Sequence, residues 1–277
     1  MGKIMIKNKT ILILLITIMS GSCEEKAGKE FPIDVPDTIV VEAILTNEVR
    51  HQEIKLTRPM SSQNQQPLPV TGAGVSLSNG NQSTDCTESI DNPGVYLSDI
   101  SFAATLGQTY YLSIIYNGKT YNAETQIVPV IPLTPLIYAP ADNKDSLFKI
   151  GWVAPDYDAE TQNMYEILID RSHLPNNSPG EPTSEKLFYY TFKTLDIIAL
   201  FAPDKEEVFF PKGSIIIERK YSLTDDYAEY LRALNAETVW QGSLFDEERG
   251  NLPSNISNGG LGYFTACSVV TDTIFVE

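Results

Sequence analysis

The feature that most constrains this chain is a period-two alternation of apolar and polar residues from Thr38 onward. Side chains of a strand point alternately to opposite faces, so this pattern predicts strands with one buried face. Turn residues recur at short intervals between the runs. About seven short strands before residue 130 favour an antiparallel β-sandwich. The alternating runs are 38–45, 53–58, 74–80, 94–100, 108–116 and 119–127.

A two-residue turn separates the last two of these runs. Asn117 and Gly118 stand there, and both tolerate the positive φ that a tight hairpin requires. We therefore expect 108–116 and 119–127 to pair as a hairpin.

A proline-rich segment, VPVIPLTP at 128–135, then breaks the alternation. Proline cannot donate to a strand ladder, so the segment predicts a domain boundary. A second β-rich region follows, and its runs at 147–155 and 164–171 are expected to pair with Trp152 pointing inward. The expected fold class is all-β, with two tandem antiparallel β-sandwich domains at 37–130 and 131–277.

One helix is expected inside the second domain, near 224–239. Thr224 is the candidate N-cap, and Asp225 and Asp226 would complement the helix dipole in the first turn. Apolar residues then follow at helical spacing, which predicts a stripe facing the chain's own core. These residues are Tyr227, Tyr230, Leu231 and Leu234.

The first 22 residues have the pattern of a cleaved export signal. Lysines come first, an apolar run of about nine residues follows, and small residues precede Cys23. That run is shorter than the roughly twenty residues of a membrane-spanning helix. Cys23 is therefore the predicted lipid-attachment site of a bacterial lipoprotein, and 23–36 the lipidated tether. The alternative is an ordinary secretory signal with an incidental cysteine nearby.

Acidic residues follow Cys23 directly, at Glu24 and Glu25. They resemble the signal that directs lipoproteins of the Bacteroidota phylum to the outer face of the outer membrane. The expected location is the outer membrane, lipid-anchored and facing the cell surface. A periplasm-facing anchor stays open, since a polar segment also serves as a plain solvated tether.

The formal net charge is −16. Nucleic acid and anionic lipid are themselves negative, so this balance argues against either as a partner.

Residues with catalytic or metal-binding chemistry are scarce. The chain has two histidines, His51 and His173, one in each expected domain, which is too few for a zinc site or a serine triad. Carboxylates cluster around Asp158 and around Glu206, but an acidic chain produces such clusters by chance. We expect no catalytic residues, no metal and no cofactor. Cys86 and Cys267 are expected either to form one bridge between the halves or to stay free.

Tyrosines are the more informative polar residues. The pairs Tyr110–Tyr111 and Tyr189–Tyr190 lie in expected strands, where regular alternation turns one member of each pair outward. Exposed tyrosines could stack on a sugar or anchor a partner protein, although tyrosine is also simply a good strand former.

Three resemblances accompany these patterns. PVTGAGVSLSNG and GQTYYLSIIYNGKTYNAE resemble a transthyretin-like or carboxypeptidase-regulatory sandwich. Trp152, Pro155 and Tyr165 resemble a fibronectin type III domain. The leader together with PDTIVVEAILTNE and NLPSNISNGGLGYFTACSV resembles a Bacteroidota lipoprotein family, domain of unknown function 4249, whose members are often encoded beside TonB-dependent receptors. The segment 255–264 is the most specific part of that resemblance.

The family resemblance implies a location and a neighbour, with no ligand or catalytic residue to carry over. The expected function is that of a non-enzymatic surface lipoprotein, a ligand-binding or docking accessory to a TonB-dependent barrel. Its small-molecule or glycan ligand stays unidentified. The alternative is a structural or adhesive envelope protein, and an enzyme comes third.

Overall fold

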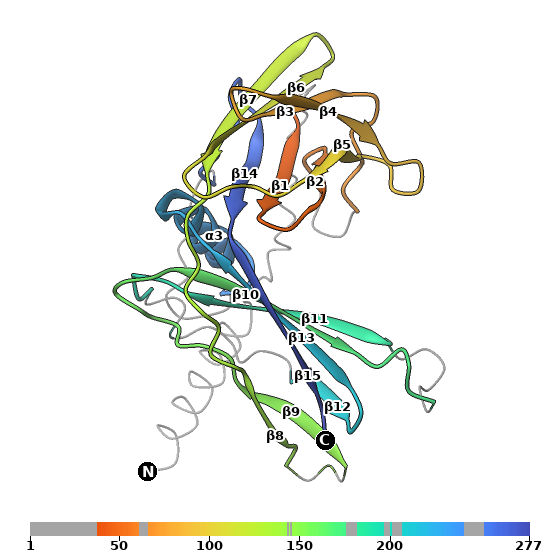
Figure 1. Cartoon of the computed structure of the whole chain (residues 1–277), viewed down its shortest axis with the longest axis vertical. Helices are drawn as coiled ribbons and strands as arrows, with labels where there is room; N and C mark the ends of the chain where they lie inside the picture. The colour runs from red at the N-terminus through yellow and green to blue at the C-terminus, as the bar shows by residue number, and fades with distance from the viewer. Residues whose placement is uncertain are drawn as a thin grey trace, which may run out of the picture. The chain divides into compact units, whose positions relative to one another are not determined.

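The structure is a computed structural model, shown in Figure 1. It describes residues 38–60, 66–142, 144, 146–175, 182–196, 200, 207–240 and 252–277. These belong to one compact unit of the chain, made of Val35–Met60 and Gln66–Glu277. The expected all-β class with a single helix in its second half is confirmed for this part of the chain. No helix within these ranges is long and apolar enough to cross a membrane.

The first sheet has eight strands, in the order β14-β1-β2-β5-β4-β3-β6-β7. Its buried face holds most of the apolar residues that the alternation predicted, including the fully buried Leu56 and Ile114, and also Phe264 of β14. Its strands are β1 (Val40–Thr46), β2 (Arg50–Thr57), β3 (Gly74–Ser78), β4 (Ser83–Glu88), β5 (Val95–Phe102), β6 (Thr109–Tyr116), β7 (Lys119–Gln126) and β14 (Leu261–Cys267).

The β6–β7 hairpin has the turn that the sequence predicts. Asn117 has φ 48° and Gly118 has φ 76°, so both central residues adopt the left-handed conformation. The strands pair in register from Thr109↔Gln126 to Tyr116↔Lys119. This turn type matches the natural twist of the paired strands.

One strand of the first sheet comes from the end of the chain. β14 pairs with β1 in parallel, from Val40↔Leu261 to Thr46↔Cys267. A strand that follows the predicted boundary near residue 130 therefore belongs to the same sheet as the strands that precede it. A parallel partner for β1 cannot be its neighbour along the chain, because parallel pairing needs a long crossover connection.

The segment just before β14 links the two outer strands of this sheet. The Asn255 amide donates to the carbonyls of Phe264 (2.7 Å) and Glu124 (3.3 Å), and its Oδ1 accepts from the Phe264 N–H at 3.0 Å. Asn258 donates to the Thr120 carbonyl at 2.6 Å. These side-chain bonds connect the two edge strands β14 and β7, which do not pair with each other in a backbone ladder, and so bring the two edges of the sheet together.

A second group of strands forms two smaller sheets. The four-stranded sheet has the order β11-β10-β13-β15, and the three-stranded sheet has the order β12-β9-β8. Apolar side chains such as Ile167, Phe210 and Ile216 form a buried cluster with members on both sheets. The strands are β8 (Ile137–Pro140), β9 (Leu147–Trp152), β10 (Asn163–Asp170), β11 (Ser184–Thr191), β12 (Phe209–Pro211), β13 (Ile215–Ser222) and β15 (Val269–Phe275).

Two expectations for this region are wrong. The predicted pair of runs, β9 and β10, lies in two different sheets. Trp152, expected to point inward, is 39% exposed. The apolar run correctly predicted a strand at β9, but it does not specify the pairing partner, which depends on contacts distant in sequence.

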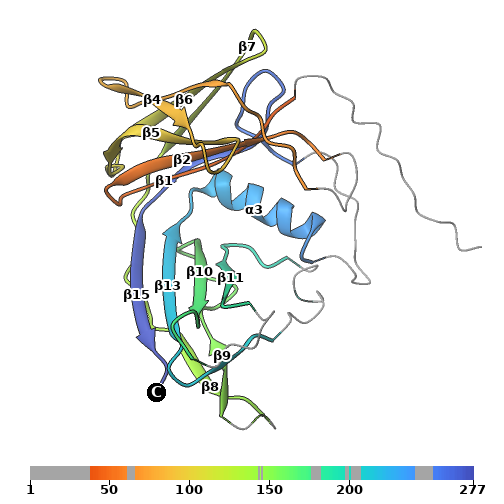
Figure 2. The same ribbon diagram turned by 90° about the vertical axis from the view of Figure 1, so that its right-hand side faces the viewer.

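The expected helix is present as α3 (Asp225–Glu237). Thr224 is its N-cap, and the Thr224 hydroxyl accepts a hydrogen bond from the Tyr227 N–H. Tyr227 and Leu231 are buried in a cluster that includes Tyr221 of β13 and Tyr263 of β14. Figure 2 shows α3 lying between β1 and β10. The apolar stripe therefore faces the chain's own core, as expected.

Candidate functional site

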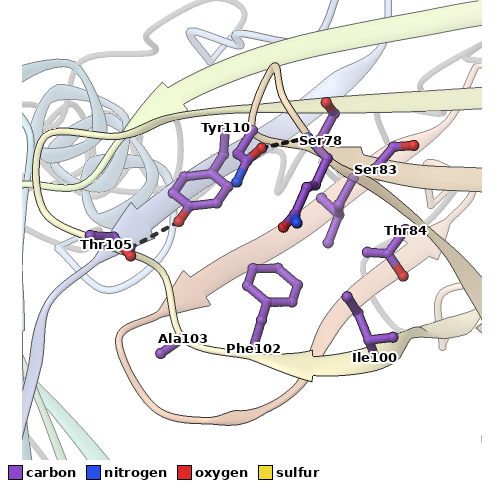
Figure 3. Close-up of a pocket in the computed structure, with 11 residues that line it drawn as sticks. Ser78, Ser83, Thr84, Ile100, Phe102, Ala103, Thr105 and Tyr110 are labelled. Carbon is purple, nitrogen blue, oxygen red and sulfur yellow. Dashed lines mark hydrogen bonds between the residues drawn. The ribbon is translucent and has the colours of Figure 1, made fainter.

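A cavity lies in the first sheet, beside the turn between β3 and β4 (Figure 3). Its volume is about 230 Å³, below the roughly 300–1,000 Å³ of sites for drug-sized ligands, so an occupant would be small. Its lining residues come from β3, β4, β5, β6, the turn between β3 and β4, and the loop between β5 and β6. They are Leu77, Ser78, Asn79, Gln82, Ser83, Thr84, Ile100, Phe102, Ala103, Thr105 and Tyr110. We call this the hydroxyl cavity.

The turn residues at this cavity are held by local hydrogen bonds. Oδ1 of Asn79 accepts from the N–H groups of Asn81 (3.1 Å) and Gln82 (2.8 Å). Gly80 has φ 85°, which glycine adopts without strain. The Gln108 amide donates to the Asn79 carbonyl at 2.9 Å and ties the turn to the start of β6. The turn is thus braced independently of any ligand.

Aromatic side chains form the apolar wall of the cavity. The rings of Phe102 and Tyr110 are stacked, with centroids 6.2 Å apart. The Tyr110 hydroxyl accepts a hydrogen bond from the Thr105 N–H at 2.9 Å, which orients the ring (Figure 3). Ile100, 55% exposed, is also in the lining.

The polar wall carries unused hydrogen-bonding groups and no charge. The hydroxyls of Ser83 and Thr105 and the amide of Gln82 have no hydrogen-bond partner among the residues that the structure describes. No acid, histidine, lysine, arginine or cysteine lines the cavity. Such a surface can bind a neutral polar molecule by hydrogen bonds and apolar contact, but it lacks a group that could act as a strong general base at neutral pH.

The two histidines lie apart from this cavity. His51 is in β2, and its Nδ1 lies 2.5 Å from the Ser98 carbonyl oxygen. His173 is exposed, with Nε2 2.9 Å from the Gly213 carbonyl oxygen. Each imidazole contacts a backbone carbonyl close to it, and the structure does not bring the two histidines together.

The two cysteines beyond the leader are buried and free. Burial raises the pKa of both thiols to about 12, and the carboxylates of Asp99 and Asp85 contribute at Cys86. Neither thiol is therefore a ready nucleophile at neutral pH. The bridge that the sequence left open is absent.

The acidic residues do not form a metal site within the described ranges: no group of three or more His, Cys, Asp or Glu side chains there is placed to hold an ion. Asp158 accepts hydrogen bonds from the N–H groups of Glu160 (2.7 Å) and Thr161 (3.1 Å), which hold its pKa below the usual value. Glu206 lies outside the described residues, and its neighbour Glu207 pairs with Lys149 at 2.7 Å.

The tyrosine pairs behave differently. Tyr111 is 43% exposed and Tyr110 is buried, as alternation predicts. Tyr189 and Tyr190 are both half-buried, because Tyr189 packs against one apolar cluster and Tyr190 against another. Alternation cannot expose a side chain where both faces of a sheet are covered.

The remaining predicted site residue, Cys23, lies outside the described residues. The hydroxyl cavity itself was missed by sequence reasoning. The only local signal was the run of small polar residues at 78–84, which also suits an ordinary turn.

These features define the class of the protein as an all-β protein with an uncharged cavity in its larger sheet. The chain belongs to the family described as domain of unknown function (DUF4249), whose model matches residues 28–273. No curated protein matches it. Among solved structures, a cytokine receptor complex (crystal form 1A) is similar at 10% identity. It covers 85% of this chain and 96% of its own, and its TM-score of 0.22 is too low to carry an argument.

Proposed function

We propose that this protein is a non-catalytic lipoprotein that binds a small neutral ligand and works as an accessory to a TonB-dependent outer-membrane transporter. In this proposal, lipid on Cys23 anchors the chain to the outer surface of the outer membrane of a Bacteroidota cell. The transthyretin-like and fibronectin-like resemblances of its two β-rich regions support a non-catalytic role. Anchoring beside the barrel would raise the effective concentration, so weak contacts would suffice.

The observation that carries the binding function is the hydroxyl cavity. It combines a stacked aromatic pair with unused hydroxyl and amide groups. Sugars and similar polyhydroxylated molecules offer both apolar faces and hydrogen-bonding groups, so they match this lining. The absence of charged side chains from the lining favours a neutral ligand over an ionic one.

The transporter is tested by affinity purification of the tagged full chain from native outer membranes in mild detergent, followed by mass spectrometry. A stoichiometric TonB-dependent barrel among the captured proteins is expected. Capture of matrix or other envelope proteins without a barrel would overturn the proposal and favour a structural or adhesive function. A solitary protein would also overturn it.

The ligand site is tested on an array of neutral monosaccharides and oligosaccharides probed with the full chain. Ala103→Trp would fill the hydroxyl cavity, whose lining includes Ala103. Ser172→Trp, on an exposed turn outside it, is the control. Binding by the wild type and by the control, with a loss of at least tenfold in Ala103→Trp, is expected. Equal binding by all three proteins would exclude this cavity as the site.

A further inference from the structure

A second cavity lies in the other β-rich region, separate from the hydroxyl cavity. Its volume is about 150 Å³, equivalent to roughly five water molecules. Trp152, Asp158, Asn163, Tyr165 and Lys220 are in its lining, together with Ile131 and Thr134 of the proline-rich segment. We call it the lysine cavity.

Lys220 is the unusual member of this lining. It lies in β13 and is only 3% exposed. Its Nζ donates to the Pro132 carbonyl oxygen at 3.3 Å and lies 5.4 Å from the centre of the Tyr165 ring. Burial lowers the pKa of Lys220, because the ammonium is removed from water. An ammonium has three N–H donors, so two of them have no partner among the described residues.

Asp158 supplies a carboxylate to the same cavity. Its Oδ1 already accepts two backbone N–H groups, so the carboxylate is held in place before any ligand binds. Asp158 and Lys220 influence each other's pKa, yet they form no ion pair in the described structure. Two opposite charges therefore line one small cavity without neutralising each other by direct contact.

Glu218 lies two residues from Lys220 on the same strand, but its side chain does not fill the lysine cavity. It is fully buried, but it is not part of the cavity lining. Its Oε2 accepts from the Leu136 N–H at 3.1 Å. Burial lowers the pKa of Lys220, and the charge of Glu218 raises it in part, as that of Asp158 does, but Glu218 and Lys220 form no ion pair.

We propose that the lysine cavity binds a small zwitterion of the chemical class of a free amino acid. The carboxylate of the ligand would accept from the two unused N–H donors of Lys220, and its ammonium group would donate to Asp158. The formal charges of Lys220 and Asp158 cancel, so a ligand with both signs suits the cavity better than a simple anion or cation. Asn163, which is 3% exposed, adds an amide at the same lining. The small volume restricts the ligand to about the size of one amino acid.

Trp152 provides the assay, since it is in the lining and 39% exposed. In the full chain, purified in mild detergent, Trp240→Phe leaves Trp152 as the single tryptophan. Glycine, alanine, leucine, glutamate and, as a simple anion, propionate are titrated separately. Saturable quenching or enhancement by at least one amino acid, with propionate binding at least tenfold more weakly, is the expected result.

Three substitutions then separate a binding role from a structural one. Lys220→Met, which keeps the length of the side chain, is expected to weaken amino-acid binding at least tenfold. Asp158→Asn keeps the Oδ1 acceptor, and it is expected to weaken amino-acid binding while strengthening propionate binding. Lys55→Met, on the first sheet, is the control and should bind as the wild type does. Circular dichroism of each variant verifies the fold.

Two results would overturn the proposal. One is the absence of saturable binding of every amino acid up to about 10 mM by the folded wild type. The other is unchanged amino-acid affinity in folded Lys220→Met and Asp158→Asn.

Discussion

Gly262 pairs with Val41 in the parallel β1–β14 ladder at a distance that leaves no room for a side chain. Gly262 has φ 83°, and a Cβ there would lie 2.1 Å from the Val41 carbonyl oxygen. Gly262→Ala therefore has to separate the two strands, in addition to adopting a left-handed conformation that L-residues disfavour. We expect a loss of more than about 3 kcal/mol in the free energy of unfolding, measured by urea denaturation.

The matched control for this substitution is Gly118→Ala in the β6–β7 turn. Gly118 has a similar φ of 76°, but nothing lies within 4 Å of the position its Cβ would take. Only the conformational cost of about 1 kcal/mol is expected. Equal losses for the two variants would show that the contact with Val41 is unimportant.

Asn255 is expected to stabilise the connection between the edge strands β7 and β14 of the first sheet. Asn255→Ala removes its hydrogen bonds to Phe264 and Glu124 and should cost about 1–3 kcal/mol. Asn255→Asp should lower the free energy of unfolding further, because a carboxylate oxygen would face the two carbonyl oxygens to which the amide N–H groups now donate. Hydrogen exchange would show faster exchange in β7 and β14. Asn81→Ala, in an exposed turn, is the control and should leave this exchange unchanged.

Glu218 predicts a defined dependence of stability on pH. Burial raises its pKa to about 7, and the nearby Asp272 carboxylate adds to the effect. Between about pH 4.5 and 7 the folded chain keeps a proton that the unfolded chain has lost, so this residue makes stability fall as pH rises. Above pH 7 the penalty is constant at roughly 2–3 kcal/mol.

Glu218→Gln removes that penalty. The variant should match the wild type in unfolding free energy near pH 4.5 and exceed it by roughly 2–3 kcal/mol at pH 8. Urea denaturation at both pH values measures the difference, with the same substitution at the exposed Glu53 as the control. A gain that is the same at both pH values would contradict the assignment.

Cys86 and Cys267 should resist alkylation in the folded protein. Their thiols are buried and have pKa values raised to about 12, so little thiolate forms at pH 8. With iodoacetamide, mass spectrometry should find both residues unmodified in buffer and both modified in concentrated urea. Modification of Cys267 in the folded chain would contradict its full burial in β14.

Sequence patterns predicted the structure correctly where it depends on residues close together in the chain. The β6–β7 hairpin follows from Asn117 and Gly118, because the turn conformation depends only on those two residues. The start of α3 follows from Thr224, because its hydroxyl accepts a hydrogen bond from the Tyr227 N–H and so caps the helix. Alternation also predicted that one residue of the Tyr110–Tyr111 pair points outward. The structure shows that this residue is Tyr111, because one face of β6 is buried and the other is open.

The same patterns could not specify partners distant in sequence. The residues around Gly262 do not indicate that Val41 lies beside it. Likewise, the run at 147–155 does not indicate that β9 and β10 belong to different sheets. Asp158 was visible as part of an acidic cluster, but Lys220 was not connected with it, since they come from a loop and a strand about sixty residues apart.

The sequence by itself determined that the described chain is built of short strands with one capped helix, because propensity, alternation and turn chemistry act over a few neighbouring residues. Only the tertiary structure decided that β14 pairs with β1 in the first sheet, that the hydroxyl cavity is uncharged, and that Lys220 and Asp158 face one small cavity. Those outcomes depend on which buried faces pack together, and that choice is made by contacts between residues distant in the chain.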